Sequence, residues 1–317
     1  MLRFDIFGIV SVVYFLAWST TGWLTAAETS TAFTAAALQC ITVSLVQVGS
    51  SGSGADAITA AQDPKCTSRW SALSASDDDA MVEIKCNDDE VMTGCNSYLP
   101  NGNAGTRDGE YIKADSGGKP VCVAQNGYEG KGVRAIARCC KWQDMQCYYI
   151  RGDKSECTDD SRSTASCDIQ VGGHNPYPTD CMAYTNWREI DGALPDAPDQ
   201  KTELSSFNSM KCFAQNGYGG AGVWSYAACC SAPDMICKEK WSPPSGSKHG
   251  DFASVTCDNG WTMTGCMSYT FWKYNDGAYI DHFDLHQDAV EDACKAVNGG
   301  NDNSVWAIAV CCKTELA

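Results

Sequence analysis

The sequence contains no Cys-x-x-Cys pair, although 20 of its 317 residues are cysteine. Structural zinc sites usually draw their thiolates from such pairs, with further cysteine or histidine at ligand spacing. An even number of regularly spaced cysteines is instead typical of a disulfide framework in an oxidising compartment. The sequence therefore predicts disulfides, no metal ligand and no bound cofactor.

Positive charge and histidine are also scarce. Lysine and arginine number 23 against 39 aspartate and glutamate residues, which gives a formal net charge of −16, and there are four histidines. Nucleic acids and anionic membranes bind cationic patches, so both are poor candidates for partners of this chain. No stretch matches a catalytic motif and the repeat cysteines are expected to be oxidised, so we predict no catalytic residue and no enzyme.

Long apolar runs are confined to the N-terminus. Ile6–Trp18 is a predominantly apolar run of thirteen residues, and Thr25-Ala26-Ala27 follows with the small residues of a cleavage site. We predict a signal peptide over residues 1–27 and a secreted, extracellular protein that does not insert into membranes once the peptide is removed. The alternative is an uncleaved anchor, for which thirteen residues fall short of the about 20 that a span needs.

A threefold repeat fills most of the chain. The stretch AQNGYEGKGVRAIARCC at 124–140 returns as AQNGYGGAGVWSYAACC at 214–230 and, more loosely, as AVNGGNDNSVWAIAVCC at 296–312. Six cysteines accompany each copy, and within each copy the first two are 20 positions apart. This regularity predicts three modules, at 66–146, 147–236 and 237–317.

The repeated stretch has the pattern of a turn followed by a strand. Asn126-Gly127 favours a tight turn because both residue types tolerate positive φ, and the residues after it read as a short strand that ends in two cysteines. Successive side chains of a strand point to opposite faces, so the two cysteines should bond to different partners. Turn signals recur every eight to twelve residues, which predicts an all-β fold of small, disulfide-stapled, sandwich-like modules.

The segment 28–65 precedes the repeat and contains a flexible Gly/Ser linker at 49–54. Its Cys40 and the additional Cys157 of module 2 fall outside the repeated set. These two unassigned cysteines could bond to each other or to another chain, which would give a disulfide-linked oligomer.

The six-cysteine module, its doublet, NGYxGxGV and WTMTGC together resemble the C-terminal cysteine- and histidine-rich domain of the proprotein convertase subtilisin/kexin type 9 family, over residues 66–312. The resemblance implies three β modules around a pseudo-threefold axis, without the protease domain. It also implies pairing of first to sixth, second to fifth and third to fourth cysteine in each module. The implied bonds are Cys66–Cys140, Cys86–Cys139, Cys95–Cys122, Cys147–Cys230, Cys167–Cys229, Cys181–Cys212, Cys237–Cys312, Cys257–Cys311 and Cys266–Cys294. The histidine richness of the family is absent here.

Two short motifs are candidates for binding. Arg151-Gly152-Asp153 follows a module boundary, where we expect a loop, and in an extracellular protein such a tip can engage an integrin. The run DHFDLHQD at 281–288 has the composition of a metal site, but an exposed polar loop is the interpretation we favour. Aromatic residues are frequent and could bind sugars or proteins, although most are expected to fill thin cores.

The function predicted from these observations is a secreted, non-enzymatic binding or scaffold protein, with an extracellular or mineralised matrix as one setting. Its partner would be an extracellular protein or a glycan. The alternatives are a soluble regulator that binds a cell-surface receptor, which the resemblance implies, and a lectin-like defence protein.

Overall fold

The structure, a computed structural model, describes residues 64–100, 107–187, 190–195, 210–271, 274–284, 290–301 and 303–315, except for the side chains of 282–284, 290 and 291. The predicted signal peptide and Cys40 lie outside these residues. The described part folds into eighteen β-strands without a helix, so the all-β prediction is confirmed. It accordingly contains no helix that could cross a membrane.

Each module supplies six strands. Module 1 contributes β1 (Lys65–Trp70), β2 (Met81–Ile84), β3 (Val91–Tyr98), β4 (Arg107–Ala114), β5 (Pro120–Asn126) and β6 (Arg134–Lys141). Module 2 contributes β7 (Gln146–Arg151), β8 (Arg162–Ser166), β9 (Tyr177–Tyr184), β10 (Ile190–Pro195), β11 (Lys211–Asn216) and β12 (Trp224–Ser231). Module 3 contributes β13 (Met235–Trp241), β14 (Phe252–Thr256), β15 (Thr262–Thr270), β16 (Asn275–Asp284), β17 (Val290–Asn298) and β18 (Val305–Thr314).

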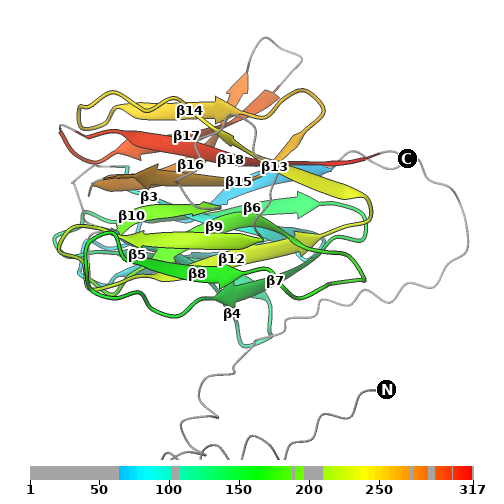
Figure 1. The fold of residues 1–317 in the computed structure, drawn as a ribbon, viewed down its shortest axis with the longest axis horizontal. Coiled ribbons are helices and arrows are strands. Elements are labelled where there is room, and N and C mark those ends of the chain that lie inside the picture. Colours follow the sequence, from blue (N-terminus) through cyan, green and yellow to red (C-terminus); the bar gives the residue numbers. More distant parts are fainter. Residues whose placement is uncertain are drawn as a thin grey trace, which may run out of the picture. The chain divides into compact units, whose positions relative to one another are not determined.

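The strands form three six-stranded sheets, and every sheet is shared by two modules (Figure 1). The orders are β1-β6-β3-β16-β17-β14, β13-β18-β15-β10-β11-β8 and β2-β5-β4-β9-β12-β7. In each sheet the first, sixth and third strands of one module continue into the fourth, fifth and second strands of another. Each module is thus a two-layered sandwich whose layers extend into different neighbours, and the three modules close on one another around a pseudo-threefold axis.

Nine disulfides staple the modules, three in each, and they join the cysteine pairs that the resemblance implies; in each module one bond joins two paired strands of one sheet and two connect the layers. In module 1, Cys140 bonds to Cys66 directly opposite on the paired strand β1, while Cys139 bonds to Cys86 beyond β2 in the other layer. The two members of the doublet therefore reach different partners, as strand geometry predicts. The sulfur atoms lie in the module cores among alanine, valine and methionine side chains.

The turn that follows β5 differs from the prediction in its mechanism. The positive φ angles fall on Glu129 (59°) and Gly132 (97°) rather than on Asn126 and Gly127. Asn126 is fully buried and acts through its side chain, which donates to the Asp77 carbonyl at 2.8 Å and accepts from the Gly132 amide at 3.1 Å. The asparagine is needed for its two hydrogen bonds, because the bend itself lies further along the chain.

The three seams between modules repeat one contact. At each seam a glycine on the fourth strand of one module faces a tyrosine on the third strand of another, and each glycine has φ between 102° and 124°. A Cβ at any of these glycines would collide with a main-chain carbonyl across the seam, so only glycine permits the approach. The pairs are Gly109 with Tyr184, Gly192 with Tyr269 and Gly277 with Tyr98.

Candidate interaction surface at the seam of modules 1 and 2

A row of aromatic rings crosses the seam where β4 of module 1 lies beside β9 of module 2. Tyr226 stacks on Tyr111 with ring centroids 5.5 Å apart, and Tyr111 contacts Tyr184 at 4.9 Å. Tyr184 in turn stacks on Trp224 at 5.7 Å. The rings come from three neighbouring strands, β12, β4 and β9, and all four are partly exposed. The row therefore joins the modules and remains partly accessible to solvent.

The hydroxyl groups of this row remain neutral at physiological pH. Burial raises the pKa of Tyr184 to about 12, and burial likewise raises the pKa of Tyr111 and of Tyr226. The Tyr184 hydroxyl donates to Oε1 of Gln125 at 3.1 Å across the seam. These groups suit hydrogen bonding to a partner and do not suit proton abstraction.

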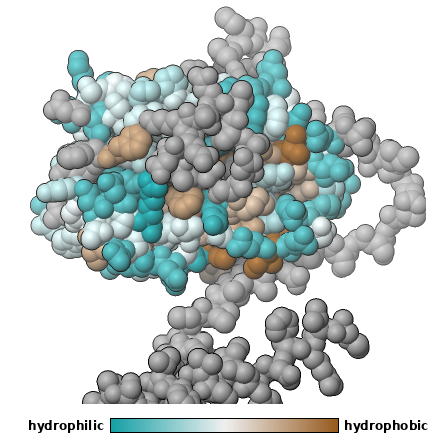
Figure 2. Space-filling model, viewed as in Figure 1, coloured by the Kyte–Doolittle hydropathy of each residue, from teal (hydrophilic) through white to brown (hydrophobic). Residues whose placement is uncertain are grey.

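The row continues into two well-exposed rings and a cation. Lys154 places its Nζ 4.5 Å from the centre of the Trp224 ring and 3.3 Å from Oδ1 of Asn186. The next residue, Trp187, is 45% exposed and stacks at 5.9 Å on Tyr128 of module 1, which is 39% exposed. Figure 2 shows one face of the molecule, on which hydrophobic residues occur singly or in small groups among hydrophilic ones. The pair of Trp187 and Tyr128 brings together one exposed ring from each of two modules at this seam.

The Arg151-Gly152-Asp153 segment borders the same surface. Arg151 is the last residue of β7. Burial raises the pKa of Tyr226, and the nearby guanidinium group of Arg151 acts in the opposite direction. The Gly152 amide donates to the Ser225 carbonyl at 2.8 Å, and a Cβ on Gly152 would come within 2.6 Å of the Thr164 carbonyl carbon. The side chains of Arg151 and Asp153 are exposed, but the main chain between them is held against the module instead of forming a free loop.

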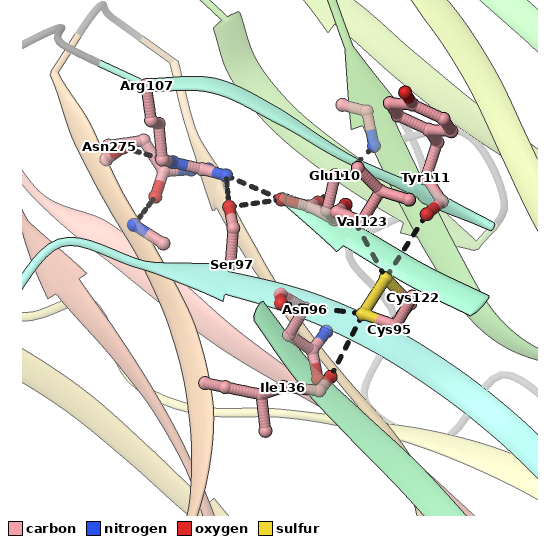
Figure 3. Close-up of polar contacts among 12 residues, drawn as sticks. Cys95, Asn96, Ser97, Arg107, Glu110, Tyr111, Cys122, Val123, Ile136 and Asn275 are labelled. Atoms are coloured by element: carbon pink, nitrogen blue, oxygen red, sulfur yellow. Dashed lines mark hydrogen bonds and ion pairs between the residues drawn. A yellow bond between two sulfur atoms is a disulfide. The ribbon is translucent and has the colours of Figure 1, made fainter. Parts of the chain in front are cut away.

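Below the surface, a buried network clamps module 1 to module 3 (Figure 3). Arg107 is 2% exposed, and its Nη1 lies 2.7 Å from both the Ser97 hydroxyl and the Glu110 carboxylate. Its Nε donates to the Asn275 carbonyl of module 3, also at 2.7 Å. Burial of the serine, acid and arginine together leaves no room for a substrate, so we interpret the network as structural.

A second buried acid, Asp180, occupies the place that Gly94 and Gly265 hold in the other two modules. Its Oδ2 accepts a 2.7 Å hydrogen bond from the Cys95 amide of module 1. Complete burial raises the pKa of Asp180 far above its usual value, against the amide hydrogen bonds that favour the charged form. A Cβ on Gly94 would lie 3.0 Å from the Asp180 Cγ, which explains why a side chain appears at only one of the three positions.

Module 3 departs from the repeat at a third buried carboxylate. Gln125 donates to Asp108 at 3.1 Å in module 1, but Val297 takes the glutamine's place in module 3. The corresponding Asp276 instead lies 3.7 Å from Nε2 of His249. Burial raises the pKa of Asp276 to about 6, with the charge of His249 acting in the opposite direction.

A geometric grouping of Cys86, Glu90 and Cys139 has the spacing of a metal site. Both sulfurs belong to one disulfide and Glu90 is paired with Arg69, so the group has no thiolate to offer. The acidic run at 281–288 cannot be placed, because its side chains after Asp281 lie outside the described residues.

Comparison with known proteins gives two matches to one family. Residues 58–144 and residues 231–315 each match a family model described as the proprotein convertase subtilisin-like/kexin type 9 C-terminal domain. The proprotein convertase subtilisin/kexin type 9 of Mus musculus is 28% identical over 250 residues, which are 78% of this chain and 32% of that protein.

The chain belongs to this C-terminal domain family. Domains of the family are non-catalytic and act in binding. The chain spans about a third of the length of the mouse relative, and the two matched ranges coincide with modules 1 and 3.

Cys157, one of the two unassigned cysteines of this family member, is exposed and has no disulfide in the described part of the chain. Its Sγ lies 3.1 Å from the Ala221 carbonyl oxygen. Cys40 lies outside the described residues, so the predicted bond between the two, or to another chain, stays a prediction.

Sequence reasoning missed the seam surface, although a signal was present. Each third strand has Ser-Tyr or Ala-Tyr at or next to its end, and each fourth strand carries Asp-Gly with a tyrosine or leucine two positions after the glycine. The repeats show that these positions are special. They do not show that the tyrosine of one module meets the glycine of another, because that contact requires the sheets to be shared.

Proposed function

We propose that this protein is a secreted, non-enzymatic binding protein that engages an extracellular protein through the seam of modules 1 and 2. The mouse relative is a secreted protein, and nine disulfides are typical of an oxidising compartment. The observation that carries the proposal is the stacked and exposed pair of Trp187 and Tyr128, which is supplied by two modules and continues into the tyrosine row. Exposed aromatic residues on a rigid frame are the residues that most often dominate protein interfaces.

A scaffold role in an extracellular or mineralised matrix fits the same surface, since Arg151 and Asp153 lie at its border and both are exposed. Adhesion through Arg151-Gly152-Asp153 would have to use a main chain that is hydrogen-bonded to the module at Gly152. The family membership favours a second candidate, a soluble regulator of a cell-surface receptor. A lectin-like protein is the third candidate and would use the exposed rings to stack on sugars.

The test uses the full secreted chain and its binding to cell surfaces and to insoluble matrix from the source tissue. The double variant Trp187→Ala/Tyr128→Ala should lose at least tenfold in affinity for its protein partner, because two hot-spot aromatics together contribute more than 1.4 kcal/mol. Phe252→Ala is the matched control, since Phe252 is 56% exposed on β14 of module 3, away from this seam.

Equal binding by the double variant and by the wild type would refute the seam as the interface. The double variant Arg151→Ala/Asp153→Ala separates adhesion from the aromatic contact, because it removes the charged side chains of the motif and leaves Trp187 and Tyr128 in place. Elution by free sugar would favour the lectin candidate. Saturable binding to intact cells would favour the receptor regulator, and retention in the insoluble fraction would favour the scaffold.

A further inference from the structure

A cluster of lysine side chains surrounds Trp261 at one edge of module 3. Nζ of Lys238 lies 4.3 Å from the centre of the Trp261 ring, and Nζ of Lys313 lies 4.9 Å from it. Lys238 and Lys240 both pair with the carboxylate of Asp258, the latter at 2.7 Å. Three ammonium groups therefore converge on one indole ring and one carboxylate.

Strand pairing produces this convergence. Lys238 and Lys240 are alternate residues of the edge strand β13, so their side chains leave the same face. Lys313 lies on the paired strand β18, opposite Ile236 and two pairs away from Cys311, the partner of Lys238, so its side chain leaves the same face. Trp261 ends the short loop after Cys257, which turns over that face.

The charge at this edge is not balanced. Hydrogen bonds from Lys238 and Lys240 lower the pKa of Asp258 to about 2, so this single carboxylate is ionised and already engaged by two lysines. Its side chain is 50% exposed, and those of Lys238 and Lys240 are 24% and 38% exposed. Three cations against one anion give a local excess of positive charge on a chain whose formal net charge is −16.

Module 1 neutralises the same edge. Glu90 stands at the position of Trp261 and pairs with Arg69, which stands at the position of Lys240. Lys141, the counterpart of Lys313, pairs with Asp89 at 2.5 Å. The cations of this edge are thus matched one to one by carboxylates.

Module 2 has no cations at the corresponding places on its first strand, where Tyr148 and Ile150 replace Lys238 and Lys240. The unbalanced lysines are therefore a property of module 3 alone. One further cation borders them from module 1, because Lys65 follows Pro64, whose carbonyl oxygen accepts from the Thr262 hydroxyl at 3.4 Å.

We propose that this lysine edge of module 3, formed by Lys238, Lys240, Trp261 and Lys313 with Lys65 at its border, binds a sulfated glycan. Sulfate groups match clustered ammonium groups, and a sugar ring can lie along an indole. Disulfide-rich proteins work outside the cytosol, where sulfated glycans are the available polyanions. The negative charge of the remaining surface repels polyanions, which confines contact to this edge. The site is separate from the seam surface, and it does not depend on the proposed function.

Heparin, a sulfated glycosaminoglycan, is the probe. The full secreted chain should be retained on immobilised heparin at low ionic strength and released by sodium chloride, because the contact is electrostatic. The triple variant Lys238→Gln/Lys240→Gln/Lys313→Gln should bind about tenfold more weakly or lose retention, since three partly exposed ion pairs together contribute roughly 1–3 kcal/mol.

The matched control is Lys85→Gln/Lys113→Gln/Lys119→Gln, which removes the same charge from three exposed lysines of module 1. Each of these pairs with its own carboxylate, Asp115, Glu83 or Asp88, so heparin binding should be retained. Both variants must show the wild-type unfolding midpoint. The proposal is overturned if the wild type is not retained, if the control weakens binding as much as the test variant, or if unsulfated polyglutamate competes as well as heparin.

Discussion

Replacing Gly277 by alanine tests the way in which the modules are joined. Gly277 has φ = 102°, and a Cβ built there lies 2.9 Å from the Ser97 carbonyl carbon, 3.2 Å from the Tyr98 Cα and closer still to the Ser97 oxygen. The Ser97 oxygen is the limiting contact, and carbon and oxygen atoms pack at about 3.3 Å, so β16 and β3 would have to separate by more than about 1 Å. The neighbouring 3.0 Å hydrogen bond from the Leu99 amide to the Asp276 carbonyl would then exceed normal length.

The cost has two parts. Alanine at positive φ costs about 1 kcal/mol, and the loss of seam hydrogen bonds and packing adds about 2 kcal/mol. Gly118→Ala is the control, because Gly118 has φ = 80° and its added Cβ would meet nothing within 4 Å. Thermal unfolding with intact disulfides should show Tm lowered by roughly 6–12 °C for Gly277→Ala and roughly 2–4 °C for the control.

An equal loss of Tm in the two variants would refute the reasoning, since it would mean that backbone strain alone matters and that the seam tolerates a methyl group.

Three further outcomes are expected. Asp276→Asn should raise the unfolding free energy by about 3 kcal/mol at pH 7.5 and hardly at pH 4. The reason is that a folded-state pKa of about 6 makes the ionised acid costly to the folded state as pH rises through that value. An equal effect of the substitution at both pH values in urea titrations would contradict this. Arg138→Met should lower the unfolding free energy by about 3 kcal/mol, because the buried guanidinium group pairs with Asp292 and donates to the Met263 carbonyl of module 3. An unchanged urea denaturation curve would show that this pair adds nothing to stability. Cys157→Ser should leave stability unaltered and abolish any disulfide-linked dimer on a non-reducing gel, whereas a dimer that persists would assign the link to another cysteine.

Much of the fold could be predicted because regularly spaced cysteines mark each copy of the repeat. Cys139 and Cys140 are adjacent on a strand, and this alone required two different partners for them. The identity of those partners needed the family resemblance, since spacing leaves many pairings open. Short strands and turns followed from local sequence, although the role of Asn126 was misjudged as conformational when its side-chain hydrogen bonds are what the turn uses.

The sites were harder to predict because each depends on residues from more than one segment. Trp187 and Tyr128 are far apart in the sequence and meet only because β4 and β9 lie side by side. Lys238 and Lys313 look like ordinary surface lysines until the pairing of β13 with β18 brings them to one indole ring. Conversely, Arg151-Gly152-Asp153 was a recognisable short motif in the sequence, and the structure holds its main chain against the module.

The sequence by itself determined three disulfide-stapled β modules, the strand that ends in each cysteine doublet and an acidic composition, because covalent spacing and strand periodicity act over short distances. Only the tertiary structure decided that each sheet is shared between two modules. That sharing depends on glycines, because the absence of a side chain allows the main chain of a neighbouring module to approach. A glycine in the sequence does not show which segment of the chain will lie against it.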